Sequence, residues 1–232
     1  MDWLVDDIDG AGLVDEYIVI SNHKFAHHFE QWAQGRAQKV TVVDDGTSTN
    51  ETRLGAVCDV QYAIGSLQLD DDMLVIAGDN LLDFSLQTFV SYAAGKGTSC
   101  IMRFYEPDEE RLHKCGIVRV ADDDRIISME EKPANPQSHW ACPPFYFYAR
   151  EHARLVSRAI SDGCGTDAPG SFIAWLAQQT PVYNEQERDT LLQHIINPYK
   201  GNLLYLDFWG MGCGPCLAGM LTQREIIKKY QE

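Results

Sequence analysis

The sequence is short of basic residues. Only 19 of its 232 residues are Lys or Arg, against 34 Asp or Glu, which gives a formal net charge of -15 and a pI of about 4.7. A surface of this sign repels nucleic-acid phosphates and anionic lipid headgroups, so we expect neither nucleic acid nor membrane as a partner. No apolar run approaches the roughly 20 residues that cross a bilayer, and the N-terminus is acidic rather than signal-like. We therefore expect a cytoplasmic protein.

Cysteine is neither abundant nor regularly spaced. The seven cysteines are odd in number, and a chain of this length can build a core without disulfides, so we expect reduced thiols. Only Cys213 and Cys216 are close enough in the sequence to form a motif. Repeats and low-complexity tracts are missing as well, and the 45% hydrophobic content is that of an ordinary globular protein.

Helical and extended patterns alternate from the first residue, which is typical of α/β layers. They predict helices near 2–11, 23–32, 53–67, 85–94, 151–161 and 172–179, and strands near 17–20, 39–43, 73–77, 99–104, 116–120, 126–129 and 145–148. The strands at 116–120 and 126–129 are expected to form a hairpin. The run at 73–77 is apolar throughout, as in buried parallel strands, whose carboxyl ends hold ligands in α/β sheets.

Two polar motifs follow predicted strands. Gly78-Asp79-Asn80 comes directly after the apolar run, where the carboxylate of Asp79 would have room for a hard cation that bridges phosphate oxygens. A tight turn that caps the next helix would explain the same residues. Glu130-Glu131-Lys132-Pro133 follows the hairpin, and there an acid can accept hydroxyl protons while an ammonium pairs with phosphate. A solvated charged turn is the alternative.

The order of these motifs matches a known family. Gly78-Asp79-Asn80, then Cys115–Val120, then Arg125–Pro133, then Phe145–Tyr148 resembles the sugar-1-phosphate nucleotidyltransferases, especially the glucose-1-phosphate thymidylyltransferase type. The resemblance covers about residues 1–182. It implies an α/β fold: a Rossmann-like, mostly parallel sheet with helices on both faces, plus a small β-hairpin.

The resemblance also implies a reaction, in which a sugar-1-phosphate oxygen attacks the α-phosphorus of a nucleoside triphosphate and expels pyrophosphate with the help of Mg²⁺. Such positioning and charge neutralisation are what phosphoryl transfer chiefly requires. Carried over by position, Asp79 would hold the magnesium, and Asp79 and Lys132 would be the catalytic residues. The substrate-binding residues would be Gly55 against the nucleobase, Asn80, Gly116 close to the sugar, and Glu131 and Lys132 on sugar hydroxyls and phosphate.

Members of this family begin with a strand and a Gly-rich, Arg-bearing loop that cradles the triphosphate, whereas this sequence starts in what would be the following helix. We therefore expect weak or no turnover, with some affinity for nucleotide sugars or sugar phosphates. A non-catalytic binding fragment is an alternative function. The sequence leaves the sugar, the nucleobase and a homo-oligomeric state open.

The tail has a resemblance of its own. Residues 200–209, followed by Cys213-Gly214-Pro215-Cys216, look like the first active-site strand and helix of a thioredoxin-like protein, in which the first Cys is activated at a helix N-terminus. This resemblance implies thiol-disulfide exchange through Cys213 and Cys216 as another alternative. The order of strand, Gly-rich loop and helix is also that of the family's missing N-terminal segment, so a speculative alternative is that the tail occupies that position in the sheet, although its loop lacks the family's basic residues. We expect a nucleotidyltransferase-like domain over 1–182, a helical connector over 183–200 and a thioredoxin-like fragment over 201–232.

Overall fold

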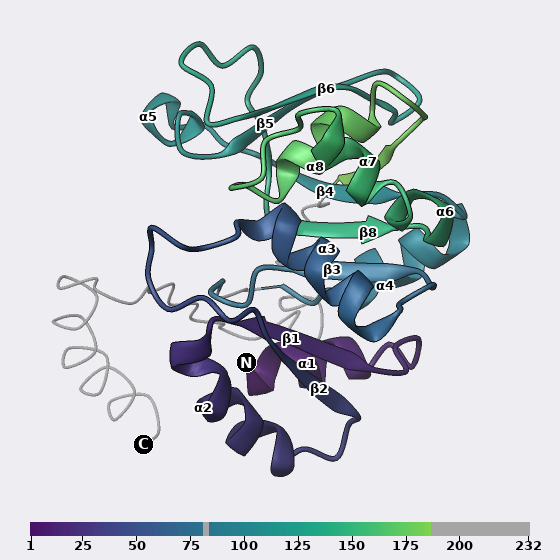
Figure 1. Ribbon diagram of the computed structural model, residues 1–232. Coiled ribbons are helices and arrows are strands. Elements are labelled where there is room, and N and C mark those ends of the chain that lie inside the picture. Colours follow the sequence, from purple (N-terminus) through teal and green to yellow (C-terminus); the bar gives the residue numbers. More distant parts are fainter. Residues whose placement is uncertain (81–83, 187–232) are drawn as a thin grey trace, which may run out of the picture. The chain divides into compact units, whose positions relative to one another are not determined.

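The computed structural model describes residues 1–80 and 84–186 (Figure 1). The chain separates into two compact units, Met1–Arg188 and Asp189–Glu232, and every described residue belongs to the first. The thioredoxin-like fragment expected over 201–232, with Cys213 and Cys216, lies outside the described residues. None of the described helices is long and apolar enough to cross a membrane.

Helices and strands alternate along the described chain, as the sequence patterns predict. The helices are α1 (Asp2–Asp9), α2 (His23–Gln34), α3 (Ala56–Leu67), α4 (Gln87–Lys96), α5 (Glu109–Leu112), α6 (Arg150–Ala153), α7 (Val156–Ser161) and α8 (Gly170–Leu176). The strands are β1 (Tyr17–Ser21), β2 (Val40–Asp44), β3 (Met73–Ile76), β4 (Cys100–Tyr105), β5 (Gly116–Val120), β6 (Ile126–Glu131), β7 (Trp140–Cys142), β8 (Phe145–Tyr148) and β9 (Tyr183–Gln186).

The strands form two sheets. The larger runs in the order β3-β8-β4-β7-β5-β6, with β9 also paired to β4, and the smaller consists of β1 and β2. The fold is α/β with a multi-stranded sheet, as expected, but the expectation of a mostly parallel sheet needs correction. In the described part of the chain only β1–β2 and β4–β9 are parallel pairs. The reason is that β8 returns between β3 and β4 and runs antiparallel to both. In addition, β7 is antiparallel to β4 and β5, and β5 and β6 form an antiparallel hairpin.

Strand β3 differs from its prediction in the same way. Instead of a fully buried parallel strand, it is half-buried along its whole length and antiparallel to β8, with Leu74 opposite Phe147 and Ile76 opposite Phe145. The aromatic strand β8 is the more buried partner, since Phe145, Tyr146 and Tyr148 are each at most 2% exposed. Hydrophobicity alone therefore identified the strand correctly but not its partner.

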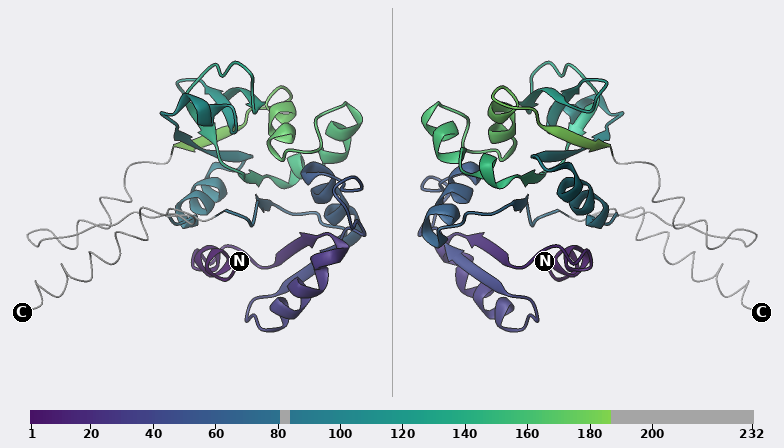
Figure 2. Two further views of the ribbon diagram at one scale, coloured as in Figure 1. Left: turned by 90° about the vertical axis from the view of Figure 1, so that its left-hand side faces the viewer. Right: turned by 90° about the vertical axis from the view of Figure 1, so that its right-hand side faces the viewer.

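The apolar side chains form two large clusters, one on each side of β3. Val75 packs against the cluster that contains Val57 and Val60 of α3, together with the helices α7 and α8. Leu74 and Ile76 pack against the other cluster, which is built from α1 and α4. Helices cover both faces of this strand, which is the layered arrangement that the sequence predicts (Figure 2).

Local signals set several helix ends. The side chain of Asn22 accepts a hydrogen bond from the Phe25 N–H over 3.2 Å and caps α2, as expected for an Asn at that position. The helix predicted near 151–161 is interrupted instead: α6 ends at Ala153, and α7 starts at Val156. The helical connector expected from residue 183 also needs correction, because Tyr183–Gln186 is strand β9; the rest of the connector lies outside the described residues.

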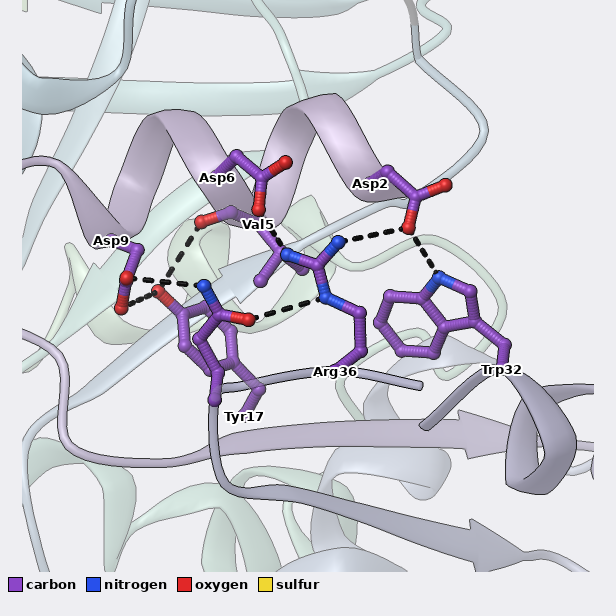
Figure 3. A network of polar contacts seen from close by, with 8 residues as sticks. Asp2, Val5, Asp6, Asp9, Tyr17, Trp32 and Arg36 are labelled. Atoms are coloured by element: carbon purple, nitrogen blue, oxygen red, sulfur yellow. Dashed lines mark hydrogen bonds and ion pairs between the residues drawn. The ribbon is translucent and has the colours of Figure 1, made fainter. Parts of the chain in front are cut away.

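A polar network ties α1 to α2 (Figure 3). The guanidinium of Arg36 donates to Oδ1 of Asp2 over 3.0 Å and also bonds Asp6, and the indole N–H of Trp32 donates to the same oxygen of Asp2 over 2.7 Å. From the other end of α1, Asp9 accepts from the phenol of Tyr17 over 3.3 Å. These contacts fix α1 against the C-terminal end of α2 and against the start of β1.

Candidate functional site

Asp79 and Asn80 form the turn after β3. The side-chain amide of Asn80 donates to the carbonyl oxygen of Ala77 over 3.1 Å and to Oδ1 of Asp79 over 3.0 Å. Asn80 is therefore held against the strand end as a turn-former. Asp79 is exposed, and its second carboxylate oxygen accepts no hydrogen bond from the described residues. That oxygen is open to a ligand from solvent.

Gly116, Glu131 and Gly170 come together at the end of the hairpin away from its turn. Gly116 is the register partner of Glu131, and a Cβ on Gly116 would lie 3.4 Å from Oε1 of Glu131 and 2.9 Å from the methyl carbon of Met129. At the start of α8, the backbone N–H of Gly170 lies near the Glu131 carboxylate and favours its charged form. A Cβ on Gly170 would overlap Oε1 of Glu131 and the Met129 methyl. Because neither glycine has a side chain, the Glu131 carboxylate fits between them.

Glu131 is electrostatically distinctive. Burial raises the pKa of Glu131, while the charge of Lys132 and the N–H of Gly170 partly offset the rise. The neighbouring thiol of Cys142 is buried, and burial raises its pKa well above the usual value, so this thiol remains neutral. A half-buried carboxylate next to a neutral thiol and an ammonium is a suitable acceptor for hydroxyl groups.

Lys132 has an unusual backbone. Its φ is 46°, in the left-handed region that non-glycine residues rarely adopt, and its N–H donates to the carbonyl oxygen of Cys115 over 2.9 Å. A backbone of this kind costs on the order of 1 kcal/mol and is common at functional sites. The side chain is exposed, and in the described part of the chain its ammonium makes no ion pair. Lys132 can therefore take an anion from solvent.

Gly55 is tied to a different segment. It has φ 91°, and a Cβ there would lie 2.6 Å from the carbonyl oxygen of Thr166. The next amides extend this contact, because Ala56 donates to the carbonyl of Asp167 over 3.4 Å and Val57 to that of Thr166 over 3.0 Å. Close approach of the 166–167 backbone is a sufficient reason for glycine at this position, whether or not a nucleobase lies nearby.

The structure thus brings some of the expected site residues together. Gly116, Glu131 and Lys132 form one group, and Asp79 with Asn80 a second, while Gly55 packs on the 166–167 loop. No hydrogen bond or ion pair between described residues joins the groups. Gly170 is the residue that sequence reasoning missed; the only signal was Pro169-Gly170 at a helix start, which is also an ordinary loop pattern.

The donor set at Asp79 fits one role in magnesium binding. Across residues 1–80 and 84–186 no three His, Cys, Asp or Glu side chains are grouped to hold a metal ion. A hard cation in a phosphate-transfer site, however, is usually held by one or two carboxylates plus substrate oxygens. An exposed carboxylate with one open oxygen, as at Asp79, fits one such ligand, provided that the substrate's phosphates supply others.

Comparison with known proteins gives a consistent set of matches. The model of a family described as nucleotidyl transferase matches residues 3–184. A glucose-1-phosphate adenylyltransferase of Rhodospirillum rubrum is 25% identical over 122 residues, which are 49% of this chain and 29% of the relative. Glucose-1-phosphate thymidylyltransferases of Mycolicibacterium smegmatis and Neisseria meningitidis are each 31% identical, over 38% and 34% of this chain and 30% and 27% of the relatives. The chain spans less than a third of each of these relatives.

Proposed function

Since the chain belongs to the nucleotidyl transferase family, we propose that its reaction is the condensation of a nucleoside triphosphate with a sugar 1-phosphate. A phosphate oxygen of the sugar phosphate forms a bond to the α-phosphorus, the bond from that phosphorus to the bridging oxygen breaks, and pyrophosphate leaves. The observation that carries the proposal is the group at Gly116, Glu131 and Lys132, on the segment that the family model matches. Names of the partial relatives agree with this substrate class.

Each residue has a role that its surroundings allow. Glu131 accepts hydrogen bonds from sugar hydroxyls, and Gly116 lets the sugar approach the strand. Lys132 neutralises phosphate charge, which matters in a chain with a net charge of -15 because polyanionic substrates are otherwise repelled. Asp79 is one ligand of Mg²⁺, which when bound neutralises charge on the triphosphate. Asn80 fixes the turn that presents Asp79, and Gly55 borders the nucleobase.

The chemistry is mainly positioning, so binding and turnover are separable. The thymidylyl type, with the synthesis of nucleotide sugars as its purpose, follows only from the resemblance and from the partial relatives. A binding measurement is therefore as important as an activity assay.

The activity arm tests Asp79. Pyrophosphate release is measured with Mg²⁺, glucose 1-phosphate and each nucleoside triphosphate in turn, for the unmodified chain, for Asp79→Asn, and for Asp71→Asn as a matched exposed aspartate. Release that is lost in Asp79→Asn and kept in Asp71→Asn supports the assigned role of Asp79. Equal release in both variants contradicts it.

The binding arm tests Glu131. Titration calorimetry with a nucleoside diphosphate glucose is expected to show binding that Glu131→Gln weakens by about tenfold or more, since a hydrogen bond to a charged group contributes on the order of 1.5–3 kcal/mol. Glu130→Gln is the matched control, because Glu130 is exposed on the neighbouring position. A folded chain that binds no nucleotide sugar and releases no pyrophosphate would refute the proposed function.

A further inference from the structure

Asp59 has a carboxylate oxygen that the fold does not bond. The residue lies in the first turn of α3, between Val57 and Val60, which belong to the core. Its Oδ1 is buried and has no hydrogen-bond partner among the described residues, although the residue as a whole is only half-buried. Buried polar atoms of folded proteins are nearly always paired, so an unpaired one needs a physical reason.

Stability of the fold does not supply that reason. Burial and the charge of Asp45 raise the pKa of Asp59 to about 6, so at higher pH the carboxylate is charged in an unfavourable place. In the described part of the chain, neither a hydrogen bond nor an opposite charge offsets this rise. A side chain that weakens the fold without bonding to it is typical of residues that serve a ligand.

Asp59 follows Gly55 by one helical turn. The N–H of Asp59 donates to the carbonyl oxygen of Gly55 over 2.9 Å. Side chains of a helix lean toward its N-terminus, so the carboxylate of Asp59 lies over the turn that Gly55 begins. Gly55 is the residue that the proposed function places beside the nucleobase. The unpaired carboxylate and the proposed position of the base are therefore on the same turn.

The same carboxylate is close to the carboxyl ends of two parallel strands. Asp45, whose charge acts on Asp59, is the first residue after β2, and its N–H donates to the carbonyl oxygen of Ser21 at the end of β1 over 3.0 Å. β1 and β2 are parallel, and α/β sheets bind ligands at this end of their parallel strands. The carboxylate of Asp45 itself accepts the N–H of Thr47 over 2.6 Å. Of these two carboxyl groups, that of Asp59 is the one left for a ligand.

The chemistry of a carboxylate distinguishes between the nucleobases. An ionised carboxylate only accepts hydrogen bonds, and it has two oxygens side by side. Guanine presents two neighbouring donors, N1–H and the 2-amino group, on one edge. Thymine and uracil present one N–H between two carbonyl oxygens, and adenine and cytosine present an amino group beside an accepting ring nitrogen. Guanine alone offers a carboxylate two donors without an opposing acceptor.

We propose that Asp59 selects the nucleobase and that the nucleotide is a guanine nucleotide, whose N1–H and 2-amino group donate to the two carboxylate oxygens. The terminal torsion of an aspartate turns over a broad range, so the group can present both oxygens to the base. The inference rests on the proposed function, which supplies the nucleotide and its position beside Gly55, and adds the identity of the base.

The test is titration calorimetry on the full chain at pH 8, with Mg²⁺ and without a sugar phosphate. GTP is compared with ITP, which lacks only the 2-amino group, and with ATP and dTTP. GTP is expected to bind about tenfold or more tightly than ITP, because ITP lacks one hydrogen bond to a charged group. ATP and dTTP are expected to bind more weakly than GTP by at least the same factor, about tenfold.

Asp59→Asn separates base selection from a structural role. It keeps the shape of the side chain but replaces one accepting oxygen by a donor, so GTP should bind within about threefold of ITP. Asp15→Asn, at an exposed position, is the matched control and should leave the ratio of the two affinities within about twofold of the unmodified chain. A general distortion of the site would weaken all four nucleotides alike and leave that ratio unchanged.

The possible results distinguish this inference from the proposed function. Nucleotides that bind without a preference for guanine, or with a preference that Asp59→Asn leaves intact, overturn the inference and leave the proposed reaction in place. If the folded chain binds none of the four nucleotides, the proposed function itself fails, and the inference fails with it.

Discussion

The contact between Gly170 and Glu131 predicts an unusual response to a small mutation. In Gly170→Ala the new methyl group would overlap Oε1 of Glu131 and the methyl of Met129. Overpacking of this kind costs about 1–3 kcal/mol. Displacing the carboxylate also moves it away from the Gly170 N–H, which favours its charged form. Alanine regains up to about 1 kcal/mol of helix propensity. We expect the free energy of unfolding to fall by about 1–2 kcal/mol.

Gly65→Ala is the matched control. Gly65 lies inside α3, and a Cβ there would meet nothing within 4 Å. The same substitution should therefore raise the free energy of unfolding by about 0.5–1 kcal/mol, because alanine favours a helix more than glycine does. Urea unfolding followed by tryptophan fluorescence measures both variants. If Gly170→Ala is as stable as the unmodified chain, the close approach of Gly170 to Glu131 is refuted.

A double-mutant cycle assigns the cause. Glu131→Ala removes the carboxylate that the new methyl group would meet, so adding Gly170→Ala to it should cost less than Gly170→Ala alone. We expect the two changes to be non-additive by at least about 1 kcal/mol, as is typical of residues in contact. Additive effects would show that Met129 or the helix start, rather than Glu131, limits the space at Gly170.

Two further substitutions test local electrostatics and strain. Burial and the charge of Asp45 raise the pKa of Asp59 to about 6, so the proton is held more tightly in the folded than in the unfolded chain. The resulting stabilisation is complete below about pH 4 and is lost as the pH rises through about 6. Asp59→Asn is therefore expected to raise the free energy of unfolding at pH 8 by about 1–2 kcal/mol and to change it little at low pH. The control is Asp15→Asn, at an exposed position, which is not expected to give this gain. A gain in Asp59→Asn that does not depend on pH would contradict the prediction. Lys132→Gly should relieve the left-handed backbone and stabilise the fold by up to about 1 kcal/mol while weakening nucleotide-sugar binding, whereas Lys132→Gln should weaken binding without that gain; calorimetry and urea unfolding distinguish the two.

Local structure was predictable where the signal is local. The run Phe145–Tyr148 predicts strand β8 with its observed bounds, and Asn22 predicts the start of α2 through its own side chain. Pairing direction was not predictable, because β3 depends on β8, far along the chain, and an apolar run looks the same beside a parallel or an antiparallel partner.

The candidate site divides in the same way. Glu131 and Lys132 are visible in the sequence as a charged pair after a strand, and the register of the hairpin brings Gly116 to them. The involvement of Gly170 depends on how α8 packs on β6, which is a tertiary contact without a local pattern. Gly55 gives the opposite lesson. The motif alone would attribute the glycine at this position to substrate binding. Its positive φ and its contact with Thr166 show that backbone packing is already a sufficient reason for it.

The position of β8 between β3 and β4 also sets an order of events during synthesis. The edges of β3 and β4 that pair with β8 stay open until Phe145–Tyr148 has left the ribosome. About 40 residues separate the end of β4 from β8, so translation at roughly 5–20 residues per second leaves both edges open for about 2–8 seconds. A nascent chain halted within that interval would expose apolar strand edges, which promote aggregation.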